Sequence, residues 1–582
     1  MSRDPGDVVV YALGMRILID VHSGSRWRTS PRPYLATLLR VALAALLSLP
    51  LAAQADRATS RPKASAKPPN LILFLVDDMG WQDTSVPFHT ERTPWNSLYR
   101  TPNMEELARR GMKFTQAYAA HPVCSPTRTS MMTGKNPART HIDDWVGHGQ
   151  SQNQYLKSPE WASRGLQPGD GNVTLPELLR QQGYRTIHIG KAHFGGKGTR
   201  GADPENLGFD LNIGGSYIGH PWGGWISPWL GKYKAAYPRM GDRPKGEYVT
   251  DALTDEAIHV IAKAVEEKVP FFLDMAHYAI HAPIQPAPRL IEGYRDGRPA
   301  VEANYASMIE SMDASLGRIL ASLRDPDGDG DAKDSIADDT LIVFMSDNGG
   351  LSNHVRARTG KIQLGNGIEA DFVKDWHNRP LRSGKGSAYE GGTRVPMIVA
   401  WAGQRSDASP LHTTLPIGPG STCNEPVHMD DFFPTFLVLA GVPEPVDEKK
   451  HDGQSLVPLL VGKPFTRKKP LFWHYPHQWT GKVGVGLGIE PFSAMRKGDY
   501  KVICFYGDGI ADGEGQDPRV ELYDLAKDIG ESRNLVRTRP KLAIQMRDEL
   551  ISWLREVGAG IPIVKSTGKP VLLPAKGSPL TY

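Results

Sequence analysis

The chain has 582 residues, of which 40% are hydrophobic and 23% are charged, a composition typical of a globular protein. Because this length exceeds what one ordinary hydrophobic core holds, we expect one large domain and a smaller one. The net charge of +4 is small for such a length and gives no support for nucleic-acid binding, which requires a clustered basic face.

Residues 1–55 are predicted to be an N-terminal extension with a signal peptide. An apolar run over residues 41–53 follows two arginines, and Ala53-Gln54-Ala55 has the small-x-small form of a signal peptidase site. The run is short for a bilayer span, and an uncleaved anchor or a buried helix is the alternative reading. We therefore expect an exported protein, periplasmic or secreted, with no integral membrane span. Residues 56–69 are polar and rich in Pro and Ala, which predicts a linker.

Residues 70–465 alternate apolar segments with helical patterns. The segments that predict buried strands lie at 70–76, 186–189, 271–275, 341–345 and 397–401. Helical patterns lie at 104–110, 175–181 and 302–323. This alternation predicts an α/β domain with a large central, mostly parallel sheet flanked by helices. In such sheets the active site lies beyond the carboxyl ends of the strands.

Residues 466–582 have a different pattern. Short segments that predict antiparallel strands lie at 471–473, 493–495, 500–505 and 521–524, and a closing helix is predicted at 541–557. We expect a smaller C-terminal α+β subdomain that contains an antiparallel sheet.

Two pairs of polar residues directly follow predicted strands. Asp77 and Asp78 end the segment 70–76, and Asp347 and Asn348 follow the segment 341–345. Buried carboxylates are costly unless a cation neutralises them, although either pair alone could equally cap a helix. An all-oxygen set suits Ca²⁺ or Mg²⁺ better than zinc.

Only three cysteines occur, which is no disulfide framework. Cys423 and Cys504 could pair, and the sequence leaves this open. Cys124 is predicted to lie near a helix N-terminus, because Pro126 is tolerated in a first helical turn and Gly134 can end the helix. A cysteine there could be a reactive thiol or a small buried side chain.

The string from Cys124 to Gly134 resembles the signature of the formylglycine-dependent sulfatases, an arylsulfatase A-like family of the alkaline phosphatase superfamily: Cys-x-Pro-x-Arg, with Thr-Gly at its end. Gly190-Lys191-Ala192-His193 resembles the second signature of that family, although a Gly-Lys pair alone is common in loops. The resemblance extends from about residue 70 to residue 535.

The resemblance implies a cofactor and a set of site residues. In the family, a maturation enzyme oxidises the motif cysteine to formylglycine, which implies this modification at Cys124. The implied ligands of a Ca²⁺ ion, with Mg²⁺ as the second choice, are Asp77, Asp78, Cys124, Asp347 and Asn348. The implied catalytic residues are Cys124, Arg128, Lys191, His193, His281 and Lys385.

The resemblance also implies a mechanism and sulfate contacts. The hydrated formylglycine attacks sulfur, His281 protonates the departing oxygen, and His193 takes a proton so that sulfate can leave. Lys385 and His281 correspond to residues that contact the sulfate in the family, and Ser216 fits a family serine near the substrate in a looser register.

The expected substrates are sulfate monoesters of carbohydrates, because the protein is predicted to be exported and has loops rich in Trp and His. His477 and Trp479 are predicted to contact the sugar. The alternatives are a phosphodiester or phosphonate monoester hydrolase of the same superfamily and a non-catalytic polyanion-binding relative.

The acidic segment from Asp325 to Asp331 resembles the start of a calcium-binding loop. Its twelfth position is Ile336 where an EF-hand has Glu, so an EF-hand is not supported. A solvated acidic turn and a second calcium site are both left open.

Overall fold

The computed structural model describes residues 10–12, 15–17, 67–147, 153–159, 164–221, 223–229, 237–241, 243–297, 300–351, 360–363, 369–372, 378–403, 409–442, 451–479, 487–507 and 518–580. The chain divides into two compact units, Met1–Ser65 and Ala66–Tyr582. In the first unit, β1 (Val10–Ala12) pairs antiparallel with β2 (Met15–Ile17). The predicted signal peptide at 41–53 lies outside the described residues. None of the helices in the described part of the chain combines the length and apolar composition that crossing a bilayer requires.

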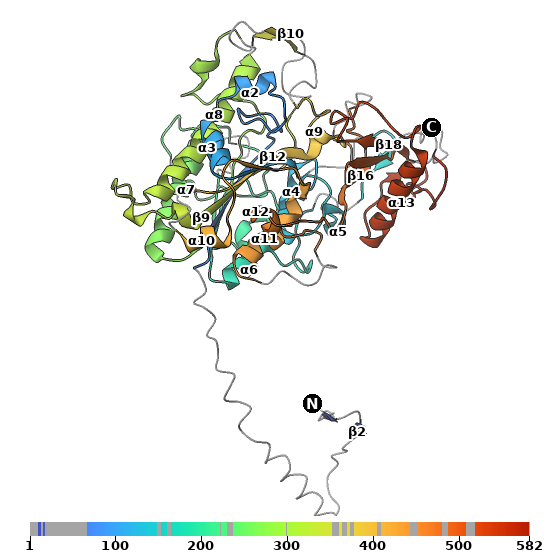
Figure 1. Ribbon diagram of the computed structural model, residues 1–582, viewed down its shortest axis with the longest axis horizontal. Coiled ribbons are helices and arrows are strands. Elements are labelled where there is room, and N and C mark those ends of the chain that lie inside the picture. Colours follow the sequence, from blue (N-terminus) through green and yellow to red (C-terminus); the bar gives the residue numbers. More distant parts are fainter. Residues whose placement is uncertain are drawn as a thin grey trace, which may run out of the picture. The chain divides into compact units, whose positions relative to one another are not determined.

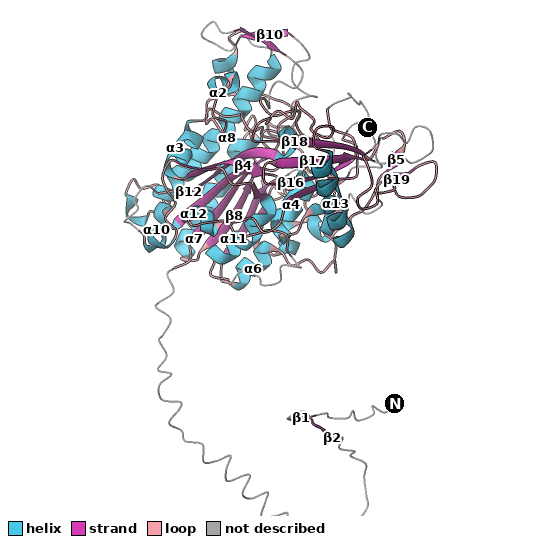
Figure 2. Ribbon diagram, turned by 45° about the vertical axis from the view of Figure 1, so that its right-hand side comes forward, coloured by secondary structure: helices cyan, strands magenta, loops and turns pink. Residues whose placement is uncertain are grey.

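A mixed sheet of nine strands forms the centre of the second unit (Figure 2). Its order is β13 (Ser421–Cys423), β4 (Met112–Tyr118), β12 (Arg394–Trp401), β9 (Thr340–Ser346), β3 (Asn70–Val76), β8 (Phe271–Ala276), β6 (Arg185–Gly190) and β7 (Leu211–Ile213), with β14 (Val427–His428) also beside β4. Strand β12 runs antiparallel to both of its neighbours, and the other pairs are parallel.

Helices cover both faces of this sheet, which explains why its central strands are continuous apolar runs. In β3, Ile72 and Phe74 join one hydrophobic core, and Leu71 and Leu73 join the other, because successive side chains point to opposite faces. The first core includes residues of α3 (Pro102–Arg110), α7 (Val249–Glu267) and α8 (Ala300–Arg324). The second includes residues of α4 (Cys124–Thr133), α6 (Leu175–Gln181) and α11 (Phe432–Leu439).

A separate antiparallel sheet follows the catalytic core. Its strand order is β15 (Leu471–Tyr475), β16 (Phe492–Lys497), β17 (Tyr500–Phe505) and β18 (Arg519–Asp524). One face packs on α13 (Pro540–Glu556), seen beside these strands in Figure 1, and the other packs on residues of the catalytic core, including Tyr118 and Val123.

The remaining elements are short. They are α2 (Pro94–Leu98), α5 (Pro137–Thr140), β5 (Leu156–Lys157), β10 (Gly360–Gln363), β11 (Glu369–Phe372), α9 (Glu390–Thr393), α10 (Pro410–Thr414), α12 (Val457–Leu460) and β19 (Ile563–Val564), with 3-10 turns at Arg200–Ala202, Pro204–Leu207, Ile291–Tyr294, Ala332–Asp334, Ala337–Asp339 and Met429–Asp431.

The predicted fold class is confirmed: the structure has the large helix-flanked α/β sheet and the smaller antiparallel sheet. All five predicted central strands form, whereas β4, β7, β13 and β14 were not predicted. Cys423 and Cys504 are both free, so the disulfide left open by the sequence is not made. The boundary proposed at residue 465 stays a prediction.

Candidate active site

Four neighbouring parallel strands deliver polar side chains to one edge of the sheet. In spatial order these strands are β9, β3, β8 and β6. The residues that follow them are Asp347 and Asn348 after β9, Asp77 and Asp78 after β3, His281 after β8, and Lys191 and His193 after β6. The turn after β6 requires glycine, because Gly190 has a φ of 101° and a Cβ there would collide with the carbonyl of Ala276.

Each aspartate at this edge pairs with a buried cation. The pairs are Lys191 Nζ–Asp77 Oδ2 at 2.7 Å, Arg128 Nε–Asp347 Oδ2 at 2.8 Å, and Lys385 Nζ–Asp78 Oδ1. The fold thus brings together, at one edge of the sheet, three cations that lie far apart in the sequence: Arg128, Lys191 and Lys385. The family resemblance implied that these residues share a site.

The pKa values of Asp77 and Asp78 are shifted in opposite directions, although each carboxylate is paired with a lysine. Burial raises the pKa of Asp77 well above its usual value, and Lys191 offsets this only in part. Burial acts on Asp78 as well, but Lys385 and then His281 outweigh it, so its pKa is lowered. Burial therefore disfavours the charged form of Asp77 even though it is paired with Lys191.

Oxygen atoms without a hydrogen-bond partner converge at this edge. They are Asp77 Oδ1, Asp78 Oδ2 and Asn348 Oδ1, all in fully buried residues. A buried acceptor left unpaired costs about 1–3 kcal/mol, and more when it is charged. Ligand atoms of Asp77 and Asp78 lie within 4.8 Å of each other, and Asn348 donates to Asp78 Oδ1 at 2.8 Å, so the chemistry of these residues fits Ca²⁺ or Mg²⁺.

Cys124 is the first residue of α4, and the whole helix is buried. Its side chain is 4% exposed, and burial raises its pKa. The helix ends where predicted, at Gly134, whose φ of 66° is the left-handed conformation that favours glycine. The predicted position of Cys124 at a helix N-terminus is therefore correct.

His193 lies next to Cys124. Its Nδ1 is 3.5 Å from Cys124 Sγ, and its Nε2 is 3.1 Å from the carbonyl oxygen of Val146. A carbonyl can only accept, so Nε2 carries the proton and Nδ1 presents a lone pair to residue 124. Burial lowers the pKa of His193 well below its usual value, which favours this neutral ring.

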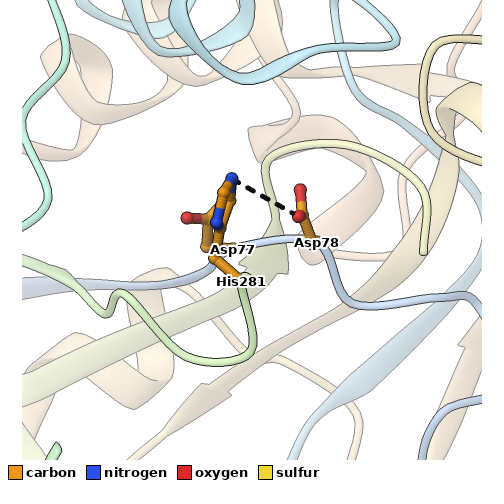
Figure 3. Close-up of side chains that lie close together, drawn as sticks. All are labelled: Asp77, Asp78 and His281. Atoms are coloured by element: carbon orange, nitrogen blue, oxygen red, sulfur yellow. Dashed lines mark ion pairs between the residues drawn. The ribbon is translucent and has the colours of Figure 1, made fainter. Parts of the chain in front are cut away.

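His281 lies beside Asp77 and Asp78 (Figure 3). Its Nε2 is 3.7 Å from Asp78 Oδ2, and its Nδ1 donates to the carbonyl of Ala282 at 2.6 Å. The side chain is 19% exposed, so it can reach both the aspartates and a ligand. The ring of His220 stacks on it with centroids 6.2 Å apart.

Two of the residues predicted to bind substrate lie beside this group. Ser216 contacts it through its backbone, because its carbonyl accepts the N–H of His193 at 3.0 Å and its hydroxyl accepts the N–H of Ile218 at 3.1 Å. Trp479 lies beside Lys385, whose Nζ is 5.3 Å from the ring centroid, and a Cβ at Gly386 would collide with the indole.

His477 does not fit its predicted sugar contact. Its side chain is 1% exposed, and its two ring nitrogens face Asp143 and Asp144 at 3.3 and 3.2 Å. The sequence showed an aromatic and histidine cluster near a loop, but composition does not reveal which member points inward. We therefore correct this assignment: His477 is a buried residue of the interface between the C-terminal sheet and the catalytic core.

The carbonyl of Val146 is a site component that the sequence could not reveal, because a main-chain acceptor leaves no residue-type pattern. The acidic segment places carboxylates of Asp325, Asp327 and Asp334 close enough to hold an ion, but they are partly or fully exposed, and such groups are common without one. The second calcium site therefore stays open.

Comparisons with known proteins agree with this geometry. A model of the sulfatase family matches residues 69–442, and a model described as the C-terminal region of N-sulphoglucosamine sulphohydrolase matches residues 384–556. A sulfatase from Formosa agariphila is 28% identical over 93% of this chain and 98% of its own. The N-acetylgalactosamine-6-sulfatase of Sus scrofa is 30% identical over 70% of this chain and 69% of its own.

Solved structures give the same result. The crystal structure of Ps i-CgsB superposes with a TM-score of 0.61 at 27% identity, covering 84% of this chain and 93% of its own, and that protein has also been solved with k-i-k-neocarrahexaose. Family and fold agree over most of the second unit. The chain belongs to the sulfatase family and is a sulfatase, an enzyme that hydrolyses sulfate esters.

Proposed function

We propose that this sulfatase cleaves sulfate monoesters of sulfated carbohydrates, using formylglycine at position 124 and a Ca²⁺ ion, with Mg²⁺ as the second choice. The observation that carries the proposal is the convergence of three unpaired buried oxygens and three buried cations around the N-terminal residue of α4. The three carboxylates and three cations balance, so a bound divalent cation would leave the site with net positive charge that attracts an anion.

The metal would be held by the side-chain oxygens of Asp77, Asp78, Asp347 and Asn348, together with residue 124. When bound, it would supply positive charge for the sulfate oxygens and lower the pKa of a hydroxyl on residue 124. Lys385 and Lys191 are already fixed by the aspartates, so their charges need no rearrangement to act on the sulfuryl group.

His281 is the proposed acid for the first step. One hydroxyl of the hydrated aldehyde at residue 124 loses its proton to water, its oxygen attacks sulfur, and the bond from sulfur to the alcohol oxygen breaks. Nε2 of His281 gives that oxygen a proton, and its exposed position beside Asp78 suits a group that meets the leaving alcohol.

His193 is the proposed base for the second step. Its Nδ1 takes the proton of the remaining hydroxyl on residue 124, the carbon–oxygen bond to the sulfate group breaks, and sulfate leaves with the electron pair. The aldehyde is restored, and water hydrates it for the next turnover. Arg128 orients this region, because it donates to Asp347 and to the carbonyl of Lys191.

Carbohydrate substrates are supported by the relatives and by Trp479. One relative is an N-acetylgalactosamine-6-sulfatase, and Ps i-CgsB has been solved with a neocarrahexaose. Trp479 places an aromatic face beside the sulfate-binding Lys385, where a sugar ring could pack. Export to the periplasm or the medium, and oxidation of Cys124 by a maturation enzyme, are parts of the same proposal.

The first test is peptide mass spectrometry of an active preparation, which should show an aldehyde in place of the thiol at residue 124. Cys124→Ala should abolish turnover. Cys423→Ala is the matched control, since Cys423 is also buried and free but lies on β13, and it should keep full activity. Only unmodified thiol at position 124 in a fully active enzyme would contradict the proposal.

The second test is a substrate panel of sulfated oligosaccharides, a small aryl sulfate, a phosphodiester and a phosphonate monoester. Trp479→Ala should raise the KM for the best oligosaccharide by about tenfold, in the range of one lost aromatic contact, and leave the aryl sulfate nearly unchanged. Preferred cleavage of the phosphorus esters would replace the sulfated-carbohydrate assignment with the phosphoryl-ester one.

A further inference from the structure

A short strap, residues 143–146, connects the catalytic base to the C-terminal sheet. At one end, the N–H of Val146 donates to Ser125 Oγ at 3.0 Å, which fastens the strap to the first turn of α4. The carbonyl of the same residue accepts Nε2–H of His193 at 3.1 Å. The position of the Val146 carbonyl therefore decides which nitrogen of His193 carries the proton.

His477 fastens the other end of the strap. It follows β15 and is 1% exposed, with Nε2 at 3.3 Å from Asp143 Oδ1 and Nδ1 at 3.2 Å from Asp144 Oδ2. Tyr475, the last residue of β15, donates its hydroxyl to Asp144 Oδ1 at 3.2 Å, and the same oxygen accepts the N–H of Trp145 at 2.8 Å. Both carboxylates of the strap are thus held from the C-terminal sheet.

We propose that His477 is a positioning residue for His193: it holds the strap so that the Val146 carbonyl keeps the proton of His193 on Nε2 and leaves Nδ1 free to face residue 124. This inference rests on the proposed function, in which Nδ1 of His193 takes a proton from residue 124. It gives the C-terminal sheet a part in catalysis that does not require contact with substrate.

The tautomer matters for one step only. If the carbonyl of Val146 moves away, the neutral ring can carry its proton on Nδ1 and present an N–H to residue 124. That ring cannot accept the proton of the hydroxyl, so the carbon–oxygen bond to sulfate breaks slowly. The earlier sulfuryl transfer uses His281 and is left largely intact.

The test is rapid-mixing kinetics of His477→Asn with a small aryl sulfate. We expect release of about one equivalent of aryl alcohol at a rate close to that of the unaltered enzyme, followed by steady-state turnover reduced about 10- to 100-fold, the range typical when a supporting residue is lost. His474→Gln is the matched control: His474 is equally buried on β15, but its ring bonds to Ser493 and Gly560 and not to the strap. We expect His474→Gln to release aryl alcohol without an initial burst and to keep the steady-state turnover of the unaltered enzyme.

A second readout does not depend on turnover. The ¹⁵N shifts of the His193 ring, identified by comparison with His193→Gln, should report a proton on Nε2 in the unaltered enzyme and a mixture of tautomers in His477→Asn. Tyr475→Phe, which removes only one bond to the strap, serves if His477→Asn does not fold. An unchanged tautomer in the folded variants, or equal loss in both kinetic phases, would overturn the inference. Failure of the proposed function would appear separately, as unmodified Cys124 in an active enzyme.

Discussion

Two buried charge clusters in this protein have similar composition but differ in how completely their carboxylate oxygens are hydrogen-bonded. The catalytic cluster consists of Asp77, Asp78, Asp347, Arg128, Lys191 and Lys385. The interface cluster, between the catalytic core and the C-terminal sheet, consists of Glu390, Glu531, Arg394, Arg496, Lys501 and Tyr118. Both combine acidic groups with three cations in the protein interior.

In the interface cluster, both carboxylate oxygens of Glu390 are bonded. Oε1 accepts from Lys501 at 3.0 Å, and Oε2 accepts from Tyr118 at 2.6 Å and from Arg394 at 3.3 Å. The pKa of Glu390 is lowered to about 2: burial would raise it, but Lys501 and Arg394 outweigh burial. In the catalytic cluster, Asp77 and Asp78 each keep one unpaired oxygen. In the interface cluster, Glu531 Oε1 also lacks a hydrogen bond, but it lies 3.0 Å from Lys501 Nζ. Burial of charge is thus common to both clusters, and the catalytic cluster differs in leaving more oxygens unpaired at one strand end.

The largest expected effect comes from changing the catalytic cluster. Asp78→Asn keeps the shape of the side chain and tolerates the backbone φ of 65° found there, but removes the charge that would hold a metal. We expect loss of bound Ca²⁺ by elemental analysis after dialysis and a fall in kcat of about 10³-fold, the upper part of what losing one catalytic electrostatic group costs. A variant that keeps stoichiometric metal would break the distinction between the clusters.

The matched change in the interface cluster is Glu390→Gln. Removing one partner of a buried ion pair costs about 3–5 kcal/mol, because the lysine and arginine charges are left uncompensated. Denaturant unfolding should therefore show a large loss of stability, while metal content and the KM of the folded enzyme stay unchanged. Metal loss in this variant would show that the two clusters are not independent.

His281→Ala tests the exposed edge of the catalytic cluster. If His281 protonates the leaving oxygen, alkyl sulfates should lose about 10²-fold or more in kcat/KM, and aryl sulfates with good leaving groups should lose much less. Steady-state kinetics over a series of leaving groups measures how the loss in kcat/KM depends on the pKa of the leaving alcohol. Equal losses across the series would assign His281 a role in binding instead.

The smallest expected effect is a pH dependence of stability that comes from Glu531. Burial raises its pKa to about 7, so the folded protein binds a proton more tightly than the unfolded chain does. Stability should then fall as pH rises from about 4.5, the unfolded value, through 7. In Glu531→Gln this fall in the urea midpoint should be reduced. If the urea midpoint of this variant falls with pH as steeply as in the unaltered protein, a group other than Glu531 causes the dependence.

The sequence predicted the elements that carry a strong local signal. The segment 70–76 was predicted to the residue, because a strand buried on both faces is continuously apolar. Strand β4 was not predicted, since its sequence MKFTQAY mixes polar and apolar residues and its burial is uneven. The antiparallel direction of β12 depends on how the chain returns to the sheet, which no local pattern records.

The candidate site, too, was predictable only where a local sequence pattern carries the signal. The strand-end pattern was sufficient to bring together Asp77 and Asp347, because strand ends meet at one edge of a parallel sheet, whereas Lys385 was implied only by the family resemblance. It could not tell that His477 points into the interface and Trp479 toward Lys385, although two positions separate them. That choice depends on packing between two sheets, and the tautomer of His193 depends on a backbone carbonyl.

The complete burial of α4 has a consequence for the order of events during biosynthesis. An enzyme that oxidises Cys124 needs access to the segment, and the finished fold leaves that thiol 4% exposed. The proposed oxidation therefore has to precede folding. Lys385, which helps to close the site, is synthesised about 260 residues after Cys124, and at typical elongation rates this takes on the order of 10–50 s. Chain growth itself thus sets the interval in which the protein can become active, and molecules that fold before modification are expected to stay permanently inert.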